Sequence, residues 1–247
     1  MTAPLIAPLG RTVDINFLGT RAKICSFDCG YCDLGPTELR LNKLKESGAL
    51  PTSEEVIETA RGLFRQIHEV GPDIDTITIS GNGEATLHPD FPEIVRGLIE
   101  LRDQWMPGKK IALFTNGSNL EQRRVAEAAN KLDIRLVKLD AGNERVFKLM
   151  NTPLSRVTLQ KILGGIRQLK DVSVQSLFTQ GVCDNTQSSD LDDWIEVIGL
   201  ILPKQVFIQT ATRPVNVAGV LACDEDTLHT IASKLERRTG LKAIVLS

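Results

Sequence analysis

The stretch CSFDCGYC at residues 25–32 places three cysteines close together, at a C-x3-C-x2-C spacing. Thiolates packed that closely repel one another unless a soft metal centre neutralises them. Iron–sulfur clusters take cysteine thiolates as ligands, usually four, so three without a fourth nearby leave one iron open. The spacing therefore predicts that Cys25, Cys29 and Cys32 hold a metal centre with a free coordination position, where chemistry can take place.

Two simpler interpretations of the triad stay open. Three cysteines could hold a zinc ion together with a histidine from elsewhere in the chain. The thiols could also be unligated. The two remaining cysteines, Cys183 and Cys223, are too few to ligate a second four-iron cluster by themselves. We expect both to be buried structural thiols, with a role as hydrogen donors as the alternative.

The composition fits one large α/β domain spanning residues 1–247, with 24% charged and 42% apolar residues. A net charge of -2 gives no basic field, which argues against tight non-specific nucleic-acid binding. Residues 1–10 lack a basic flank and a long apolar run, so neither a signal peptide nor a membrane span is expected. Clustered thiols and an odd cysteine count disfavour a secreted disulfide scaffold, and we predict a cytoplasmic location.

Strand-like and helix-like patterns alternate along the whole chain. A strand is expected at residues 12–18, because apolar Val13, Ile15 and Phe17 alternate with polar Thr12, Asp14 and Asn16. The sequence TSEE at residues 52–55 is a capping-box pattern and predicts the start of a helix. Further strands are expected at 74–80, 110–115, 134–140, 172–178, 205–210 and 241–246, separated by helices near 91–105, 120–131, after 155, around 191–198 and at 224–238.

Alternating strands and helices imply parallel βαβ units. Several strands also carry a polar face, as in Thr76, Thr78 and Ser80. A fully packed, doubly wound sheet would be apolar on both faces, so these positions favour a curved sheet around a wet or ligand-filled interior. The expected fold is an α/β incomplete (β/α)6 TIM-like barrel.

Polar residues follow three of the predicted strands. The segment SGNGE at residues 80–84 combines glycines, which let backbone approach a ligand, with a carboxylate that can accept hydrogen bonds from an ammonium group. Asn116 and Gly117 end the next strand, where Asn-Gly is also an ordinary turn signal. Lys138 and Asp140 lie two residues apart and must point to the same side of the sheet. Taken singly, each of these features could be a plain turn or a surface pair.

The cysteine spacing, with the aromatic Tyr31 just before the third cysteine, resembles the signature of the radical S-adenosylmethionine (SAM) superfamily. The resemblance implies a 4Fe-4S cluster whose open iron binds SAM. It also implies reductive cleavage of SAM to a 5'-deoxyadenosyl radical, which abstracts hydrogen from a substrate. The core of that superfamily is an incomplete barrel with its site at the carboxyl ends of the strands.

The resemblance also implies roles for the residues at the strand ends. Gly81, Gly83 and Glu84 are similar to the glycine-glycine-glutamate element that holds the amino group of SAM, with Asn82 inserted between the glycines. Asn116 is expected to line the SAM pocket. Candidate contacts with the SAM carboxylate, adenine, ribose or substrate come from Lys138, Asp140, Tyr31, Gln175, Gln209 and Arg213. Three of these residues have an alternative role: Tyr31 could pack in the core, Arg213 could form a structural salt bridge, and Asp140 could pair with Lys138. His88 is a weaker candidate for contact with the substrate.

Four stretches read together narrow the resemblance: SGNGEATLHPDF at 80–91, VKLDAG at 137–142, QTATRP at 209–214 and the cysteine stretch. They resemble the small radical SAM proteins grouped with the wybutosine-synthesis iron–sulfur oxidoreductases. The resemblance implies a small-molecule, nucleoside or tRNA substrate and an electron donor such as flavodoxin or ferredoxin, with no membrane partner. An activator that generates a radical on a partner protein, and a non-enzymatic zinc or redox module, stay open as alternatives.

Overall fold

The computed structural model describes residues 9–19, 22–37, 50–153 and 156–246, so most of the stretch 1–10 considered above lies outside the described residues. Within that part of the chain, seven strands form one parallel sheet in the order β1-β2-β3-β4-β5-β6-β8. They are β1 (Thr12–Asn16), β2 (Thr76–Ser80), β3 (Lys110–Thr115), β4 (Ile134–Lys138), β5 (Val172–Gly181), β6 (Gln205–Thr210) and β8 (Ala243–Leu246). A short strand, β7 (Val220–Ala222), pairs antiparallel with β5.

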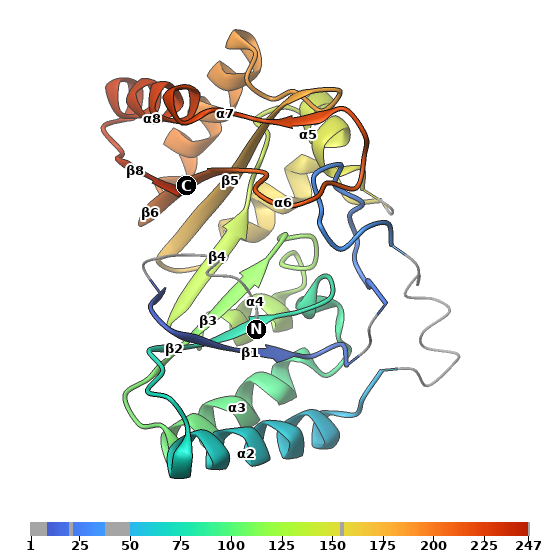
Figure 1. Cartoon of the computed structure of the whole chain (residues 1–247), viewed down its shortest axis with the longest axis vertical. Helices are drawn as coiled ribbons and strands as arrows, with labels where there is room; N and C mark the ends of the chain where they lie inside the picture. The colour runs from blue at the N-terminus through green and yellow to red at the C-terminus, as the bar shows by residue number, and fades with distance from the viewer. Residues whose placement is uncertain (1–8, 20–21, 38–49, 154–155, 247) are drawn as a thin grey trace.

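The helices connect successive strands and lie around the outside of the sheet (Figure 1). The described helices are α2 (Ser53–Val70), α3 (Phe91–Trp105), α4 (Arg123–Ala129), α5 (Glu144–Asn151), α6 (Leu159–Ile166), α7 (Ser188–Ile201) and α8 (Glu225–Thr239), with a 3-10 turn, η2 (Ala85–Leu87), after β2. None of these helices is long and apolar enough to cross a membrane.

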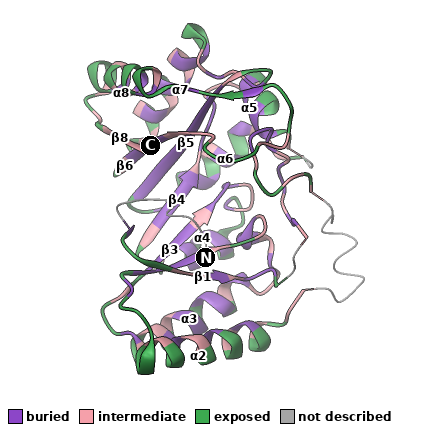
Figure 2. Cartoon of the chain, in the orientation of Figure 1, coloured by how far each residue is buried: buried purple, intermediate pink, exposed green. Residues whose placement is uncertain are grey.

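The sheet is a partial barrel, as predicted. It begins at β1 and ends at β8, which are the two outer strands of a path that does not close. Six βα units are extended by the seventh parallel strand β8, which pairs with β6. The outer face of the sheet packs on the helices in one large core, whose most deeply buried large side chains include Trp194, Phe64 and Phe91. Figure 2 shows this burial running along the strands and the inner sides of the helices.

Side chains on the inner face change character along the strands. Leu9, which precedes β1, packs with the mid-strand residues Ala112, Leu136 and Phe207 in an apolar layer across the interior. Toward the carboxyl ends, directly paired residues on the same face are polar, as where Lys138 lies beside Gln175. The predicted polar face is therefore present at the carboxyl ends of the strands and, in Thr76 and Ser173, at their amino ends, with the apolar layer between them.

Candidate functional site

A cavity of about 660 Å³ lies at the carboxyl ends of the strands, on the inner face of the sheet. Its size is that of a small-molecule site. It gathers eleven of the predicted site residues, from the cysteine stretch and from the ends of five strands: Cys25, Cys29, Tyr31, Cys32, Gly81, Gly83, Glu84, Asn116, Lys138, Gln175 and Arg213. Gln209 also lines it, whereas Asn82 and Asp140 lie outside its lining.

The cysteine loop, residues 22–37, is attached to the loop after β2 through backbone. The Ile24 N–H donates to the Asn82 carbonyl at 2.8 Å, and the Glu84 N–H donates to the Ile24 carbonyl at 2.9 Å. Gly83 lies between these two bonds with φ at +135°, and a Cβ at this position would be 1.8 Å from the Ile24 oxygen. Only glycine fits there, because both the conformation and the space exclude a side chain.

Two further segments hold the other side of the loop. The Gly30 N–H donates to the Met150 carbonyl at 3.2 Å, and the Asp28 N–H donates to the Asn151 carbonyl at 3.0 Å. The Val217 N–H, from the segment after β6, donates to the Gly30 carbonyl at 3.0 Å. The cysteines therefore lie on a loop fixed by three segments that are far apart in the sequence.

The thiols of the triad are in surroundings that suit a metal-bound thiolate. Burial raises the pKa of Cys25 to about 12 and that of Cys29 to about 11. Such thiols are protonated at neutral pH unless a metal displaces the proton. Two side-chain amides point N–H groups at them: Asn116 Nδ2 lies 3.5 Å from Cys25 Sγ, and Asn151 Nδ2 lies 3.4 Å from Cys29 Sγ.

All three thiols of the triad lie in the wall of the same cavity. Among the described residues, no three His, Cys, Asp or Glu side chains converge on one position where they could hold a metal ion. A mononuclear zinc site needs such convergence. A 4Fe-4S cluster instead takes one thiolate on each iron, so its cysteines lie around a larger body. Three cysteine thiols in one cavity wall are therefore a donor set that fits such a cluster.

Both oxygens of the Glu84 carboxylate accept hydrogen bonds from the protein. Its carboxylate accepts from the Thr86 N–H at 3.1 Å, the Thr86 hydroxyl at 2.6 Å, the Thr115 hydroxyl at 2.7 Å and the Asn116 N–H at 2.6 Å. Burial raises its pKa, although these donors favour the charged form. Three of these donors bond to Oε1 and only the Asn116 N–H bonds to Oε2, so the carboxylate joins the end of β2 to the end of β3 and Oε2 keeps capacity for the expected bond to the amino group of SAM.

Asn116 joins the cysteine loop to the end of β3. Its Nδ2 donates to the Ser26 hydroxyl at 3.0 Å, and its Oδ1 accepts from the Ser118 N–H at 2.9 Å. The Ser26 and Ser118 hydroxyls are themselves 2.6 Å apart. Asn116 lines the cavity as predicted, and it also fixes the position of the first cysteine.

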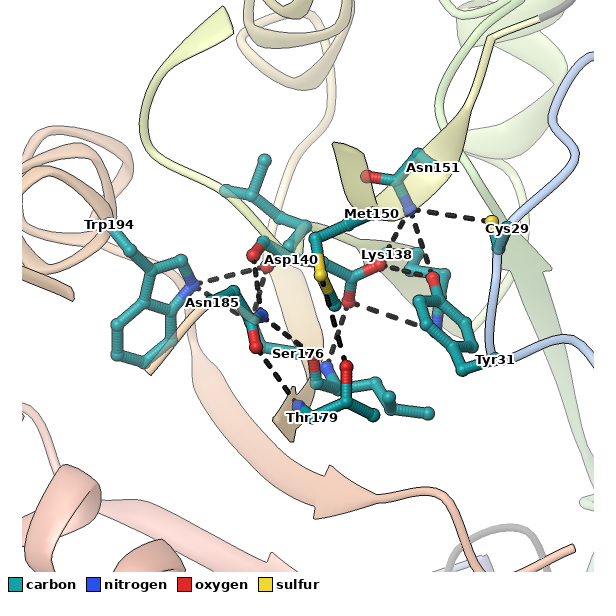
Figure 3. A network of polar contacts seen from close by, with 12 residues as sticks. Cys29, Tyr31, Lys138, Asp140, Met150, Asn151, Ser176, Thr179, Asn185 and Trp194 are labelled. Atoms are coloured by element: carbon teal, nitrogen blue, oxygen red, sulfur yellow. Dashed lines mark hydrogen bonds and ion pairs between the residues drawn. The ribbon is translucent and has the colours of Figure 1, made fainter. Parts of the chain in front are cut away.

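Lys138, Tyr31 and Asp140 form one group beside the cavity (Figure 3). The Lys138 ammonium lies 4.7 Å from the centre of the Tyr31 ring and 3.8 Å from Asp140 Oδ1. The buried Asp140 carboxylate accepts from the Tyr31 hydroxyl and, at 2.8 Å, from the Leu177 N–H. Of the roles considered for Asp140, the structure contains the ion pair with Lys138. Lys138 itself faces the cavity and offers it a cation.

The remaining candidates fall into two groups. Gln175 and Gln209 point into the cavity from β5 and β6. Arg213 lines its rim, where its guanidinium donates to Asp33 Oδ2 at 2.6 Å, so the salt bridge considered from the sequence is present. His88 is outside the cavity lining: its ring contacts the Pro51 carbonyl at 2.9 Å and accepts from the Asp90 N–H, which is a structural role.

Two residues of the site were missed by sequence reasoning. Asn151, at the end of α5, contacts the Cys29 thiol. Lys23 lies in the cavity wall with its ammonium bonded to Asp28 at 3.1 Å and to the Gly35 carbonyl at 2.8 Å. Burial acts to lower the pKa of Lys23, but Cys32 and Asp28 outweigh it and raise that pKa. Lys23 could have been noticed from its place beside the triad, whereas no sequence signal connects Asn151 to Cys29.

Comparisons of the sequence with known proteins find relatives that match most of the chain. The UPF0026 protein slr1464 of Synechocystis is 29% identical over 211 residues, which cover 83% of this chain and 72% of that protein. A probable GTP 3',8-cyclase of Methanococcus aeolicus is 30% identical over 189 residues, covering 72% of this chain and 54% of the cyclase. The chain spans 56 to 63% of three further UPF0026 proteins, from Helicobacter pylori and Methanocaldococcus jannaschii.

Among solved structures, TYW1 with a lysine-pyruvate adduct bound has a similar fold, with a TM-score of 0.64 over 96% of this chain and 76% of that one. The sequence identity is 13%, so the likeness concerns the fold. The family model of the radical SAM superfamily matches residues 21–198, which contain the cysteine triad and strands β2 to β5. The match covers most of the chain and includes the cavity residues from the cysteine loop to β5, whereas Gln209 and Arg213 lie beyond it. The chain therefore belongs to the radical SAM superfamily of enzymes.

Proposed function

We propose that this enzyme reductively cleaves SAM at a 4Fe-4S cluster held by Cys25, Cys29 and Cys32. The main support for the proposal is that one cavity is lined both by the cysteine triad and by the strand-end residues. When bound, the cluster supplies the electron that cleaves the SAM sulfonium and yields a 5'-deoxyadenosyl radical for hydrogen abstraction. Membership of the superfamily implies both cofactors.

The chain's own residues would bind and orient SAM. Lys138 offers a cation for the SAM carboxylate, held in place by the Tyr31 ring and Asp140. Gly81 and Gly83 bring backbone to the cavity wall without side chains. The Glu84 carboxylate joins the ends of β2 and β3, and its Oε2, which accepts only from the Asn116 N–H, keeps capacity for the SAM ammonium group beside the backbone carbonyls of this wall.

We further propose a nucleoside-type substrate. The similar protein from Methanococcus aeolicus is named a probable GTP 3',8-cyclase, and TYW1 belongs to wybutosine synthesis. Gln175 and Gln209 face the same cavity, and each amide offers both a donor and an acceptor, as recognition of a base edge requires.

We also propose that an electron carrier such as flavodoxin or ferredoxin supplies the electron. The five cysteines, which form no disulfide among the described residues, suit a reducing cytoplasm.

The first test is anaerobic reconstitution with iron and sulfide, followed by EPR of the reduced protein with and without SAM. We expect a four-iron signal that shifts on adding SAM, together with 5'-deoxyadenosine on chromatography. Cys29→Ala should abolish the signal and the product. Cys223→Ala, which removes an equally buried thiol outside the cavity, should leave both unchanged. A wild-type cluster that is indifferent to SAM would refute the proposal.

The substrate class has its own test. Purine nucleoside triphosphates, free nucleosides and unfractionated tRNA are each added to the reconstituted enzyme with SAM and reductant. A nucleoside-type substrate should increase the rate of 5'-deoxyadenosine formation several-fold, and a deuterated substrate should transfer its deuterium to the 5'-deoxyadenosine. Stimulation only by a co-purifying protein would favour the partner-activation alternative instead.

A further inference from the structure

The side-chain amide of Asn151 lies against one cysteine of the triad (Figure 3). Its Nδ2 is 3.4 Å from Cys29 Sγ, 3.0 Å from the Tyr31 hydroxyl oxygen and 2.7 Å from Asp140 Oδ2. The amide carries two hydrogens. Asp140 is the closest acceptor and takes one of them, so the second is directed at the sulfur and the Tyr31 oxygen.

The position of this amide is fixed by the backbone on both sides. Asn151 is the last residue of α5, and Thr152 follows with φ at +40°, which turns the chain toward the cysteine loop. The Asn151 carbonyl then accepts from the Asp28 N–H at 3.0 Å, one residue before Cys29. The residue is 3% exposed. Water therefore does not compete for the hydrogen, and the amide cannot easily turn away from the sulfur.

A second amide makes the same kind of contact from another element. Asn116 Nδ2, at the end of β3, lies 3.5 Å from Cys25 Sγ and 3.0 Å from the Ser26 hydroxyl. Two of the three thiols are thus each approached by an asparagine that is not part of the cysteine loop. The Cys29 contact is the deeper of the two, since Cys29 is buried and Cys25 is partly exposed.

Such contacts act on the charge of a cluster. A reduced cluster carries one more negative charge than its oxidised form, and part of that charge resides on the thiolate sulfurs. An N–H group directed at a sulfur stabilises the more negative form, and hydrogen bonds to sulfur are one of the features that set cluster potentials. The interaction is stronger in a site from which water is excluded.

We infer that Asn151 is a positioning residue that raises the reduction potential of the cluster by donating to the Cys29 thiolate. The inference rests on the proposed function, because it requires a cluster at the triad. It assigns to α5 a role in how easily the enzyme accepts its electron, in addition to holding the cysteine loop.

The test compares two asparagine variants in the full-length, reconstituted enzyme. Asn151→Leu removes the amide and keeps the branching of the side chain at Cγ. Asn185→Leu is the matched control: Asn185 is also 3% exposed and donates to the Asp140 carbonyl at 2.9 Å, but it contacts no sulfur among the described residues. EPR-monitored redox titration should give a lower midpoint potential for Asn151→Leu and an unchanged one for Asn185→Leu. Equal potentials in all three proteins, or equal shifts in both variants, overturn the inference.

A second measurement covers the case in which Asn151→Leu fails to retain its cluster. Wild-type enzyme carrying asparagine labelled with ¹⁵N only in the side chain is reduced and studied by pulsed EPR. Hyperfine coupling to the label is expected, and it should persist in Asn116→Ala, which leaves the Asn151 contact. Absence of coupling overturns the inference even when the cluster cleaves SAM normally. A wild-type protein that assembles no cluster overturns the proposed function and this inference together.

Discussion

Gly83 lets two loops touch through their backbones at the wall of the cavity. Gly83→Ala would force a Cβ against the Ile24 carbonyl and impose a conformation that alanine avoids. We expect destabilisation of about 1–3 kcal/mol from the backbone conformation alone, with lower iron content per chain after reconstitution. Thermal unfolding and iron analysis measure the two effects.

The control is Gly62→Ala in the exposed part of α2, where an added Cβ meets nothing within 4 Å. That change should stabilise the protein by about 0.5–1 kcal/mol and leave its iron content unchanged. Equal iron content in the two variants would mean that the contact between the loops does not support the triad.

Glu84 is predicted to act as a structural carboxylate. Glu84→Gln keeps the shape but replaces one acceptor oxygen with an NH2 group, which cannot pair with the donors that Glu84 now satisfies. Leaving buried donors unpaired should cost about 1–3 kcal/mol in the free energy of unfolding. Glu100→Gln, on the exposed side of α3, should be neutral. Denaturant titration measures both, and a neutral Glu84→Gln would contradict this structural role.

At the residue scale, the sequence predicts which side chains meet at the cavity better than it predicts their partners. The inward placement of Lys138 and Gln175 follows from the alternation of side chains along strands. The partners of Glu84 come from Thr86, Thr115 and Asn116, and their convergence depends on how two strand ends lie side by side. Such distances in space are not encoded in any local pattern.

The start of α2 is an element whose local signal is complete. Thr52 accepts from the Glu55 N–H at 3.2 Å, and Glu55 accepts from the Thr52 N–H at 2.8 Å, which is the predicted capping box. Thr52→Ala should lower the free energy of unfolding by about 1 kcal/mol. Thr59→Ala, one turn into the exposed helix, removes only a bond to the Glu55 carbonyl and should be near neutral. Chemical denaturation distinguishes them, and equal effects would contradict the capping argument.

Two elements were missed from the sequence, and both make long-range contacts. Helix α5 does have a local signal, because the Asn143 side chain caps it by accepting from the Val146 N–H at 2.9 Å, and its last two carbonyls accept from the cysteine loop. Strand β7 has three residues and pairs with the end of β5, which extends β5 to Gly181. Longer elements with their own caps and apolar stripes, such as α2 and α8, were predicted from local signals.

On the scale of the whole molecule, the ion pair between Asp33 and Arg213 joins the cysteine loop to the segment after β6 across the rim of the cavity. Both side chains are more than a third exposed, so the pair should contribute less than about 1 kcal/mol to stability. If Arg213 also binds SAM or substrate, Arg213→Ala should weaken binding of SAM to the reconstituted enzyme more than Asp33→Ala does. Isothermal titration of both variants and of the double variant checks this. Identical losses in the two single variants would indicate that the arginine acts only through the ion pair.

The three attachments of the cysteine loop also determine when the site can exist during synthesis. Ile24 can form its backbone hydrogen bonds only after the loop around Gly83 has been synthesised, and Gly30 can bond to Met150 only later. The Gly30 carbonyl accepts from the Val217 N–H, which lies far along the chain. Contacts of such separation form late, because their loop-closure entropy is offset only once the intervening elements are in place. A nascent chain that has emerged only as far as α7 carries all three cysteines but lacks one side of their binding loop. We therefore expect the loop that carries the triad to be complete only after β6 and the segment around Val217 have been synthesised and folded.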